Sequence, residues 1–394
     1  MGSSKHNELP SGWEIKKLDE VSFIDMGQSP DSEFYNEEEI GLPLIQGNAD
    51  MKNGRSIKRY FTSQITKKCN KGDFILSVRA PVGKIGIASF ESCLGRGVCS
   101  IRSKSEDSNF LFQLLLSLEN KWEKLEQGST FSAISGGDIK NFKILLPPLP
   151  EQRAIANVLS TWDTAIQTTQ DLISQKEAEK KWLMQNLLTG KKRLKGFSGE
   201  WKEIHIRDVS KEVSIKNKSD KQLTVLSCTK YKGLVPSLEY FGRKIFADDV
   251  STYKIVPLNH FAYATNHIEE GSIGYQERYN EALISPMYTV FKTDESVNDT
   301  FIYRLLKSHP LVYQYQNRME GSIDRRGGLR WDAFSIIKIK LPTLEEQTVI
   351  AQVLQTAEKE IELLKTKLEQ QKLQKKGLMQ VLLTGKVRIK TNDI

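Results

Sequence analysis

Two long stretches of the chain carry apolar residues at alternating spacings of three and four. Each begins at a glutamate that follows a proline-containing segment, Glu151 or Glu346, and each ends at a glycine, Gly190 or Gly385. This spacing predicts amphipathic helices of roughly 39 residues, which is roughly 58 Å at 1.5 Å per residue. Glycine readily adopts the left-handed conformation that terminates helices. The pattern therefore predicts two long helices, one in the middle of the chain and one near its end.

The apolar positions of these stretches have the spacing of a coiled-coil seam. Residues three and four apart share one face of a helix, so two such faces can pack together. The alternative is that each helix packs on its own domain as an ordinary amphipathic helix. We predict that the following residues pair the two helices: Ile155, Leu159, Ile166, Ile173, Leu187, Ile350, Leu354, Ile361, Leu368 and Leu382.

Two features of the helices leave alternatives open. Lys180 and Lys375 interrupt the seam at equivalent positions. We favour lysines that extend to water near a helix end, and the alternative is a polar break that sets the register. Apolar residues beside the seam predict a second buried face, available to another protein chain. These residues are Val158, Ala165, Leu172, Leu188, Val353, Leu363, Leu373 and Leu383.

The two helical stretches are copies of one another. Leu146-Pro147-x-Leu149-x-Glu151-Gln152 recurs as Leu341-Pro342-x-Leu344-x-Glu346-Gln347, and Leu187-Leu188-Thr189-Gly190-Lys191 recurs as Leu382-Leu383-Thr384-Gly385-Lys386. One offset relates all of these matches, and chance does not hold a register over so many residues. The only glycine inside the stretches is Gly377, which replaces Trp182 of the first copy and predicts a weak point.

The segments before the helices match more loosely, as in Asn109-Phe110-Leu111 and Thr300-Phe301-Ile302. The chain therefore has the organisation A–helix–A′–helix′, in which the globular parts share a frame and differ in their loops. We predict a first domain at 1–150, a helical spacer at 151–191, a second domain at 192–344, a second spacer at 345–386 and a tail at 387–394.

The globular parts have the pattern of an α+β fold. Short apolar, β-like runs such as 74–78, 85–88 and 288–291 alternate with Gly, Asn and Asp turns. Each part then has a predicted helix, near 108–126 in the first and 299–318 in the second.

Composition narrows the class of protein. A length of 394 residues suits two or three domains, and no apolar run is long enough for a membrane span. The four cysteines form no CxxC pair, and the first residues do not form a signal peptide, so we expect a cytoplasmic protein. The net charge is +8, and it is uneven: 1–150 has 19 basic and 19 acidic residues, whereas 192–344 has 24 basic and 18 acidic residues. A polyanionic partner is therefore permitted.

Basic residues interleaved with aromatic and amide residues suit phosphate contacts and the reading of base edges. They lie in the loops that differ between the two halves. Arg325 and Arg326, between glycines, form the most basic of these loops, and packing against Asp324 and Asp332 is the alternative to DNA contact. The candidate DNA-binding residues are Arg55, Lys58, Arg59, Tyr60, Arg79, Arg96, Lys230, Tyr231, Lys232, Arg278, Arg325 and Arg326.

Catalytic motifs are missing from the sequence. It has no Walker loop, no HExxH and no Asn/Asp-Pro-Pro-Tyr/Phe of the methyltransferase type. Pro30-Asp31 begins like a PD-(D/E)xK nuclease, but Glu37-Glu38-Glu39 lacks the lysine, and the five histidines show no metal-ligand spacing. We therefore expect no catalytic residue and no metal. A sequence-reading DNA subunit, an architectural scaffold for other proteins and, less favoured, an enzyme remain as alternatives.

The whole set of motifs resembles the specificity subunit of type I restriction–modification systems. The likeness rests on the two duplicated helix motifs above and on Ser77-Val78-Arg79-Ala80-Pro81-Val82-Gly83 and Ser285-Pro286-Met287-Tyr288-Thr289-Val290-Phe291. It implies two target-recognition domains separated by two long antiparallel coiled-coil helices with pseudo-twofold symmetry.

The resemblance also implies a function. Each domain is expected to read one half of a bipartite, asymmetric site in double-stranded DNA. Two methyltransferase subunits are expected to dock on the helices, and two restriction subunits to join for cleavage. S-adenosylmethionine is expected on the methyltransferase partner, so this chain itself is expected to hold no cofactor and to perform no catalysis.

Overall fold

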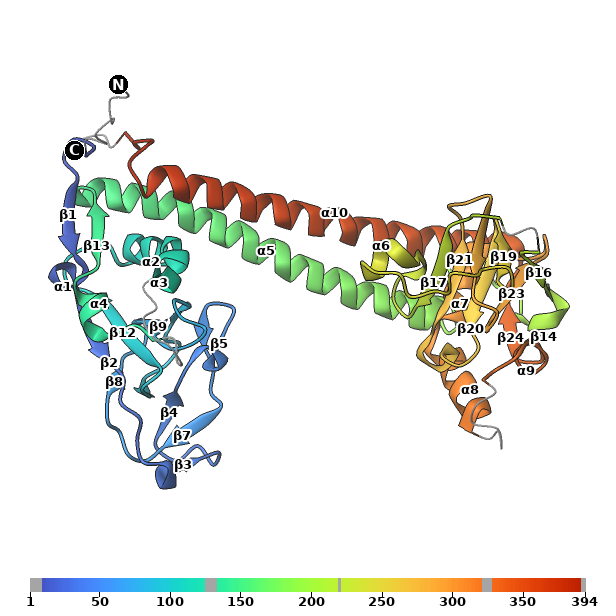
Figure 1. The fold of residues 1–394 in the computed structure, drawn as a ribbon, viewed down its shortest axis with the longest axis horizontal. Helices are drawn as coiled ribbons and strands as arrows, with labels where there is room; N and C mark the ends of the chain where they lie inside the picture. Colours follow the sequence, from blue (N-terminus) through green and yellow to red (C-terminus); the bar gives the residue numbers. More distant parts are fainter. Residues whose placement is uncertain (1–8, 125–132, 219–220, 321–327, 391–394) are drawn as a thin grey trace. The chain divides into compact units, whose positions relative to one another are not determined.

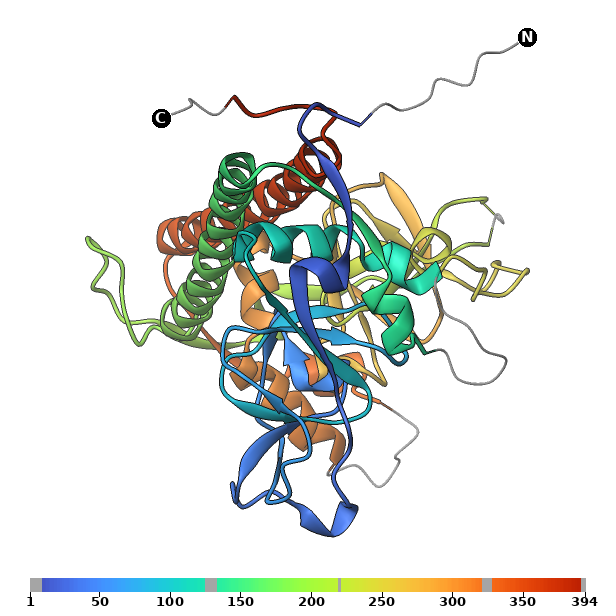
Figure 2. The same cartoon turned by 90° about the vertical axis from the view of Figure 1, so that its left-hand side faces the viewer.

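The computed structural model describes residues 9–124, 133–218, 221–320 and 328–390. The chain forms two compact units, which divide both long helices between them. Unit 1 consists of Met1–Gln170 and Thr366–Ile394, and unit 2 of Asp171–Lys365. Because the second helix returns to unit 1, each unit holds one globular domain and parts of both helices (Figures 1 and 2).

The two predicted helices are present and continuous. They are α5 (Leu149–Leu187) and α10 (Leu344–Leu382) (Figure 1). Gly190 and Gly385 follow them with φ of +69° each, the left-handed termination that the sequence predicts. Gly377 does not interrupt α10, which continues for another turn to its end. Among the described helices, none combines the length and apolarity that a membrane span requires.

In unit 1 the domain contains a two-stranded sheet, β1-β13, a six-stranded sheet, β2-β12-β9-β10-β6-β5, and a five-stranded sheet, β3-β7-β4-β11-β8. Its elements are β1 (Glu14–Lys17), α1 (Leu18–Val21), β2 (Ser22–Met26), β3 (Tyr35–Asn36), β4 (Leu42–Ile45), β5 (Met51–Lys52), β6 (Arg55–Ser56), β7 (Tyr60–Thr62), β8 (Lys68–Cys69), β9 (Phe74–Ser77), β10 (Ile85–Ile87), β11 (Ser92–Leu94), β12 (Val98–Ser103), α2 (Ser108–Ser117), α3 (Glu119–Lys124), α4 (Gly136–Lys140) and β13 (Lys143–Leu146).

In unit 2 the sheets are β14-β24, a four-stranded β15-β23-β20-β21 and a five-stranded β16-β19-β22-β17-β18. Its elements are β14 (Lys202–His205), β15 (Ser210–Glu212), β16 (Ile215–Lys216), β17 (Val225–Thr229), β18 (Gly233–Pro236), α6 (Ser237–Phe241), β19 (Lys254–Pro257), β20 (His260–Ala264), β21 (Ile273–Gln276), β22 (Glu281–Ile284), β23 (Tyr288–Thr293), α7 (Asp299–Leu306), α8 (His309–Glu320), α9 (Trp331–Ser335) and β24 (Lys338–Leu341).

The two domains share a frame of strands. The antiparallel order β2-β12-β9-β10 corresponds to β15-β23-β20-β21, and the parallel pair β4–β11 corresponds to the parallel pair β17–β22. The domains differ in what is added to that frame: unit 1 has the β5–β6 hairpin, whereas unit 2 has β18 and the short α6. The expectation of a common frame with different loops is confirmed, and the fold is α+β with an internal repeat.

Each predicted domain helix is broken into two pieces. The first breaks at Leu118, between α2 and α3, and the second after Lys307, between α7 and α8. Both residues have ψ near 0°, which leaves the α-helical conformation. In unit 2 the second residue of α8 is Pro310, which cannot continue the hydrogen-bond ladder of α7.

Each unit has its own main core, in which the long helices take part. In unit 1 the first turns of α5, through Ile155 and Leu159, and the last turn of α10, through Leu382, pack with Trp122 and Phe110 of the domain. In unit 2 the roles are reversed, since the start of α10 and the end of α5 pack on the domain. The helix ends are therefore part of the domain cores.

Candidate nucleic-acid interface

The glutamate of the repeated motif holds the start of one long helix to the segment that follows the other. In unit 1, Arg388 donates from Nε and Nη2 to the two carboxylate oxygens of Glu151, at 2.6 and 2.7 Å, and Trp13 donates from its indole nitrogen at 3.1 Å. The Glu151 side chain is only 4% exposed. Such a two-point guanidinium–carboxylate contact fixes both position and angle. We call these three residues the unit 1 clasp.

Unit 2 repeats this arrangement. Arg193 donates to Glu346 at 2.5 and 2.6 Å, and its guanidinium lies 5.8 Å from the ring centre of Trp201. The Trp201 indole nitrogen, however, is buried and has no hydrogen-bond partner among the described residues. Arg193, Glu346 and Trp201 form the unit 2 clasp. Our sequence reasoning missed both arginines, although they recur at the same offset as the motifs beside them.

The glutamine next to each clasp glutamate joins the domain to the long helix. Gln152 accepts from the backbone amide of Asp107 at 3.0 Å, and Gln347 accepts from that of Asn298 at 2.9 Å. Asp107 and Asn298 are the N-caps of α2 and α7. The Glu-Gln pair of the motif therefore orients the domain helix as well as the chain end.

A second charged contact joins the domain helix to both long helices. In unit 1, Asp163 of α5 accepts from Gln113 of α2 and from Lys375 of α10, both at 2.6 Å. In unit 2, Glu358 of α10 accepts from Arg304 of α7 at 2.5 Å and pairs with Lys180 of α5 at 3.0 Å. We call each of these three-residue sets a junction.

The junctions decide between the two interpretations of Lys180 and Lys375. Each lysine pairs with an acid on the other long helix, and Lys375 is 9% exposed. The favoured interpretation, an ammonium group extending to water, is wrong for Lys375, because its charge is buried against a carboxylate. Both lysines join the two long helices through an ion pair, which is the kind of contact that a register-setting polar residue makes.

Ion pairs within each unit show that the long helices run antiparallel. In unit 2, Glu177 pairs with Lys365 at 2.6 Å and Lys180 pairs with Glu358 at 3.0 Å, so rising numbers on α5 meet falling numbers on α10. In unit 1, Asp163 pairs with Lys375. The antiparallel pairing of α5 and α10 predicted from sequence is thus observed within each unit (Figure 1).

The residues predicted to pair the helices are placed in two environments. Ile173 and Ile361, at 8% and 7% exposure, are buried away from the domain core clusters, and Ile166 and Leu368 are half-buried. The remaining six lie in the domain cores: Ile155, Leu159, Leu187, Ile350, Leu354 and Leu382.

The domains of this chain cover the predicted second apolar face at the helix ends. Leu188 and Leu383 are buried in the two domain cores, and Val158 and Val353 pack against them. Leu172, Leu363 and Leu373 stay exposed, at 38%, 61% and 67%. The expectation that another chain covers the whole face was wrong for the helix ends, because the domains return onto them.

Three of the candidate DNA-binding arginines in unit 1 lie on adjoining loops. Arg79 and Arg96 extend from the paired ends of β9 and β12, where the Val78 amide donates to the Gly97 carbonyl at 2.9 Å. Arg59 joins them through Asp50, at 3.1 Å.

Asp50 holds the next loop as well, since its other oxygen accepts from the amides of Gln46 and Gly47 at 2.7 and 3.2 Å. The Gly95 amide donates to the Ile45 carbonyl at 2.8 Å, which places this loop beside the one that carries Arg96. The side chains of Arg59, Arg79 and Arg96 are exposed. The result is one loop cluster with exposed guanidinium groups and the amide of Gln46.

The other unit 1 candidates are exposed but less clearly grouped. The Tyr60 ring lies 5.5 Å from the Arg59 guanidinium carbon. Lys58 lies 3.9 Å from Glu39 and over the rings of Phe61 and Phe90. Arg55 is on β6, which pairs with both β5 and β10.

In unit 2 the candidates gather beside α7. Lys307 Nζ donates to the carbonyls of Lys230, Gly271 and Ile273 at 2.8 to 3.2 Å, and its burial lowers the pKa of this amine. Lys232 and Arg278 line one cavity of about 320 Å³ with Arg304 and Glu358 of the unit 2 junction. Tyr231 is 85% exposed. Arg325 and Arg326 lie outside the described residues.

One group of potential metal ligands was not predicted from the sequence, because it consists of a single histidine and two glutamates. The ligand atoms of His267, Glu269 and Glu270 lie within 4.8 Å of one another. Two of the three side chains are exposed, and such groups commonly gather without a metal, so no metal site is assigned to them.

Comparison with known proteins adds family membership to this geometry. The model of the type I restriction modification DNA specificity domain matches the chain twice, at 10–178 and 198–372. Over 196 residues the chain is 41% identical to a Methanocaldococcus jannaschii protein assigned as the type I restriction enzyme MjaX specificity subunit. That match covers 49% of this chain and 46% of the relative, so the chain matches less than half of that relative's length.

Two longer matches cover nearly the whole chain. The M. jannaschii type I restriction enzyme MjaVIII specificity subunit is 27% identical over an alignment of 416 positions, and this alignment covers 97% of this chain and 94% of the relative. The crystal structure of the type I restriction–modification S subunit from M. genitalium has a TM-score of 0.57 at 16% identity, covering 96% of this chain and 98% of that one. At that identity, the structural likeness shows the fold.

Proposed function

The chain belongs to the type I restriction–modification DNA specificity family, and we propose that it reads a bipartite, asymmetric site in double-stranded DNA with its two domains. Each domain reads one half-site, and neither is catalytic. Adenine methylation, with S-adenosylmethionine, takes place on two methyltransferase subunits, and two restriction subunits join for cleavage. The chain acts on cytoplasmic DNA.

The observation that carries this proposal is the contrast between frame and loops. Two different half-sites require two domains with the same attachment and different reading loops. The clasps and junctions attach both domains in the same way, whereas the added elements differ: the β5–β6 hairpin in unit 1, and β18 with α6 in unit 2.

The arginine cluster of unit 1 supports a DNA-reading role. Arginine is the side chain best suited to the two-point reading of guanine, and it also binds phosphate. The cluster combines Arg59, Arg79 and Arg96 on adjoining loops with the amide of Gln46. Gln46 could read adenine in the same groove.

The exposed leucines of the long helices support docking of the methyltransferase subunits. Leu172 and Leu363 in unit 2 and Leu373 in unit 1 are large apolar side chains in contact with water. Trp182 on α5 is also exposed, at 46%. Exposed apolar side chains that gather on one surface are a feature of interfaces with another protein.

The test is an exchange of domains in the full complex with the methyltransferase subunit. Replacing 201–341 with the matching segment of a relative should change one half of the methylated motif and leave the other half intact. Mapping methylated adenines in the host genome measures both halves at once. A change in both halves would contradict independent reading domains.

The competing function is a protein scaffold whose contact with DNA is incidental. Its support is the same set of exposed apolar side chains on the helices. Titrating the complex with selected and random duplexes separates the two functions. Equal affinity for both kinds of duplex would favour the scaffold.

A further inference from the structure

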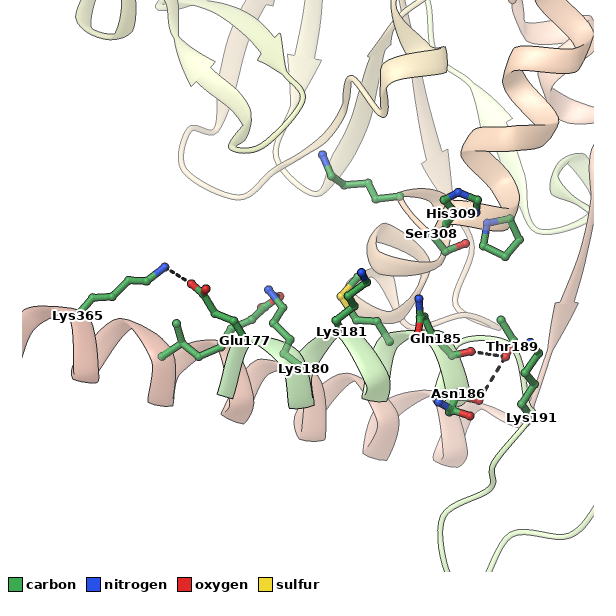
Figure 3. A pocket seen from close by; sticks show the side chains of 15 residues that line it. Glu177, Lys180, Lys181, Gln185, Asn186, Thr189, Lys191, Ser308, His309 and Lys365 are labelled. Atoms are coloured by element: carbon green, nitrogen blue, oxygen red, sulfur yellow. Dashed lines mark hydrogen bonds and ion pairs between the residues drawn. The ribbon is translucent and has the colours of Figure 1, made fainter. Parts of the chain in front are cut away.

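Unit 2 contains a cavity of about 780 Å³ to which the proposed function gives no role. It lies between the C-terminal half of α5, a facing stretch of α10 and the turn that joins α7 to α8 (Figure 3). Its volume is in the range of sites that bind small molecules.

The charge of the cavity wall is positive. Five lysines line it, against two glutamates and one histidine. The glutamates are already paired: Glu177 with Lys365 at 2.6 Å, and Glu358 with Lys180 at 3.0 Å and with Arg304. The five lysines are Lys180, Lys181, Lys191, Lys307 and Lys365.

Two of these lysines carry charge that the described residues do not neutralise. Lys181 and Lys191 are exposed and form no ion pair within the described part of the chain. Lys181 points from α5 toward the turn that carries Ser308 and His309 (Figure 3).

A buried hydroxyl group at the wall lacks a hydrogen-bond partner. Ser308 is 7% exposed, and its Oγ has no partner among the described residues. Ser308 directly precedes α8, a helix of 12 residues whose dipole is positive at this end. Because a buried hydroxyl without a partner is costly, the site calls for a ligand atom that accepts or donates a hydrogen bond there.

Unit 1 provides the matched comparison. The repeat places Lys376 and Lys386 where unit 2 has Lys181 and Lys191, so the two lysines by themselves do not distinguish the units. Ser117, the counterpart of Ser308, donates to the Leu114 carbonyl at 2.6 Å. The next residue but one is the acidic Glu119, where unit 2 has Pro310. As far as the structure describes the two units, only unit 2 combines the lysines with an unsatisfied hydroxyl and no acid at this turn.

We propose that this cavity binds a phosphate-bearing small molecule. The phosphate group takes a hydrogen bond from Ser308 at the start of α8 and pairs with Lys181 and Lys191. The organic part of the ligand packs on the apolar wall formed by Met184, Pro310 and Ile361.

The first test is titration calorimetry of the full chain with AMP and with inorganic phosphate at constant ionic strength. AMP should bind saturably and at least about tenfold more tightly than inorganic phosphate, because only AMP can use the apolar wall. Equal affinities for the two probes, or no saturable binding, would overturn the assignment.

The second test uses the internal repeat as its control. The double variant K181E/K191E should lose AMP binding by at least about tenfold, whereas K376E/K386E at the equivalent positions of unit 1 should bind as the parent does. A similar loss in both double variants would mean diffuse electrostatic binding and would refute the site.

The third test concerns the hydroxyl and the competing ligand. Ser308→Ala should weaken AMP binding severalfold with an unchanged melting temperature of the free protein, whereas Ser117→Ala should leave binding unchanged. Displacement of AMP by a random-sequence duplex would instead assign Lys181 and Lys191 to DNA and overturn the proposal. All of these readouts are independent of sequence-specific recognition.

Discussion

Both units attach their domain to the long helices at equivalent positions, but they use different side chains. At the unit 1 junction a neutral amide, Gln113, contacts Asp163, whereas at the unit 2 junction a guanidinium, Arg304, contacts Glu358. The clasps differ as well, because Trp13 donates to Glu151 but the Trp201 indole makes no hydrogen bond within the described part of the chain. The repeat therefore keeps the geometry of each contact while its chemistry varies, so equivalent substitutions should have unequal costs.

The largest effect is expected where a charge enters the helix pair. Ile361→Asp buries a carboxylate at a position that is 7% exposed and should cost about 3–5 kcal/mol of unfolding free energy. The equivalent Ile166 is half-buried, so Ile166→Asp should cost clearly less. Urea unfolding measures both, with the Ile→Val variants as controls for lost volume. Equal costs would show that the helix pair is packed alike in the two units.

The clasps should respond next. Arg193→Ala leaves Glu346, whose side chain is 1% exposed, without its partner, and should cost about 3 kcal/mol. Arg388→Ala should cost less, because Glu151 keeps the hydrogen bond from Trp13. Adding Trp13→Phe to Arg388→Ala should remove that advantage. Thermal melts of the three variants test the order, which fails if Arg388→Ala is the more damaging change.

The candidate DNA contacts of the two units are compared next, with base reading tested at Arg96 of unit 1 and phosphate contact tested at Arg278 of unit 2. If Arg96 reads a base, Arg96→Ala should lose about 1–3 kcal/mol of binding and relax the preference at one position of one half-site. If Arg278 contacts phosphate, Arg278→Ala should weaken all sequences similarly and reduce the salt dependence. Affinities for cognate and shuffled duplexes at two salt concentrations separate these results. Parental affinity and salt slope in a variant would remove that residue from the interface.

The smallest effect is expected from making one junction resemble the other. Arg304→Gln retains a hydrogen-bond donor toward Glu358 and should cost about 1 kcal/mol. Gln113→Arg places a charge at a site that is 2% exposed, but this charge lies opposite Asp163. We expect it to lower the free energy of unfolding by a similar amount. Urea unfolding at low and high salt is the measurement. If a junction variant lost more unfolding free energy than the clasp variants, the junction and not the clasp would be the main contact that holds the domain to the long helices.

Much of the molecule could be predicted from its periodicity and its repeat. The spacing of Ile155, Leu159 and their counterparts predicts two long helices, and Gly190 and Gly385 mark their ends. These features are local, because backbone geometry fixes the period of a helix and glycine relieves the strain that follows its end. The shared offset also predicts that whatever one half of the chain forms, the other half forms again.

Only the tertiary structure decided which distant side chains meet. Nothing in the sequence relates Gln113 to Asp163 and Lys375, since the domain helix and the long helices have different offsets in the repeat. For the same reason Lys375 was expected to extend to water, and the second apolar face was expected to stay free for a partner. Whether a charge is buried, or a hydroxyl such as that of Ser308 is left unpaired, depends on how the domain packs back onto the helices, and a periodic pattern contains no information about that packing.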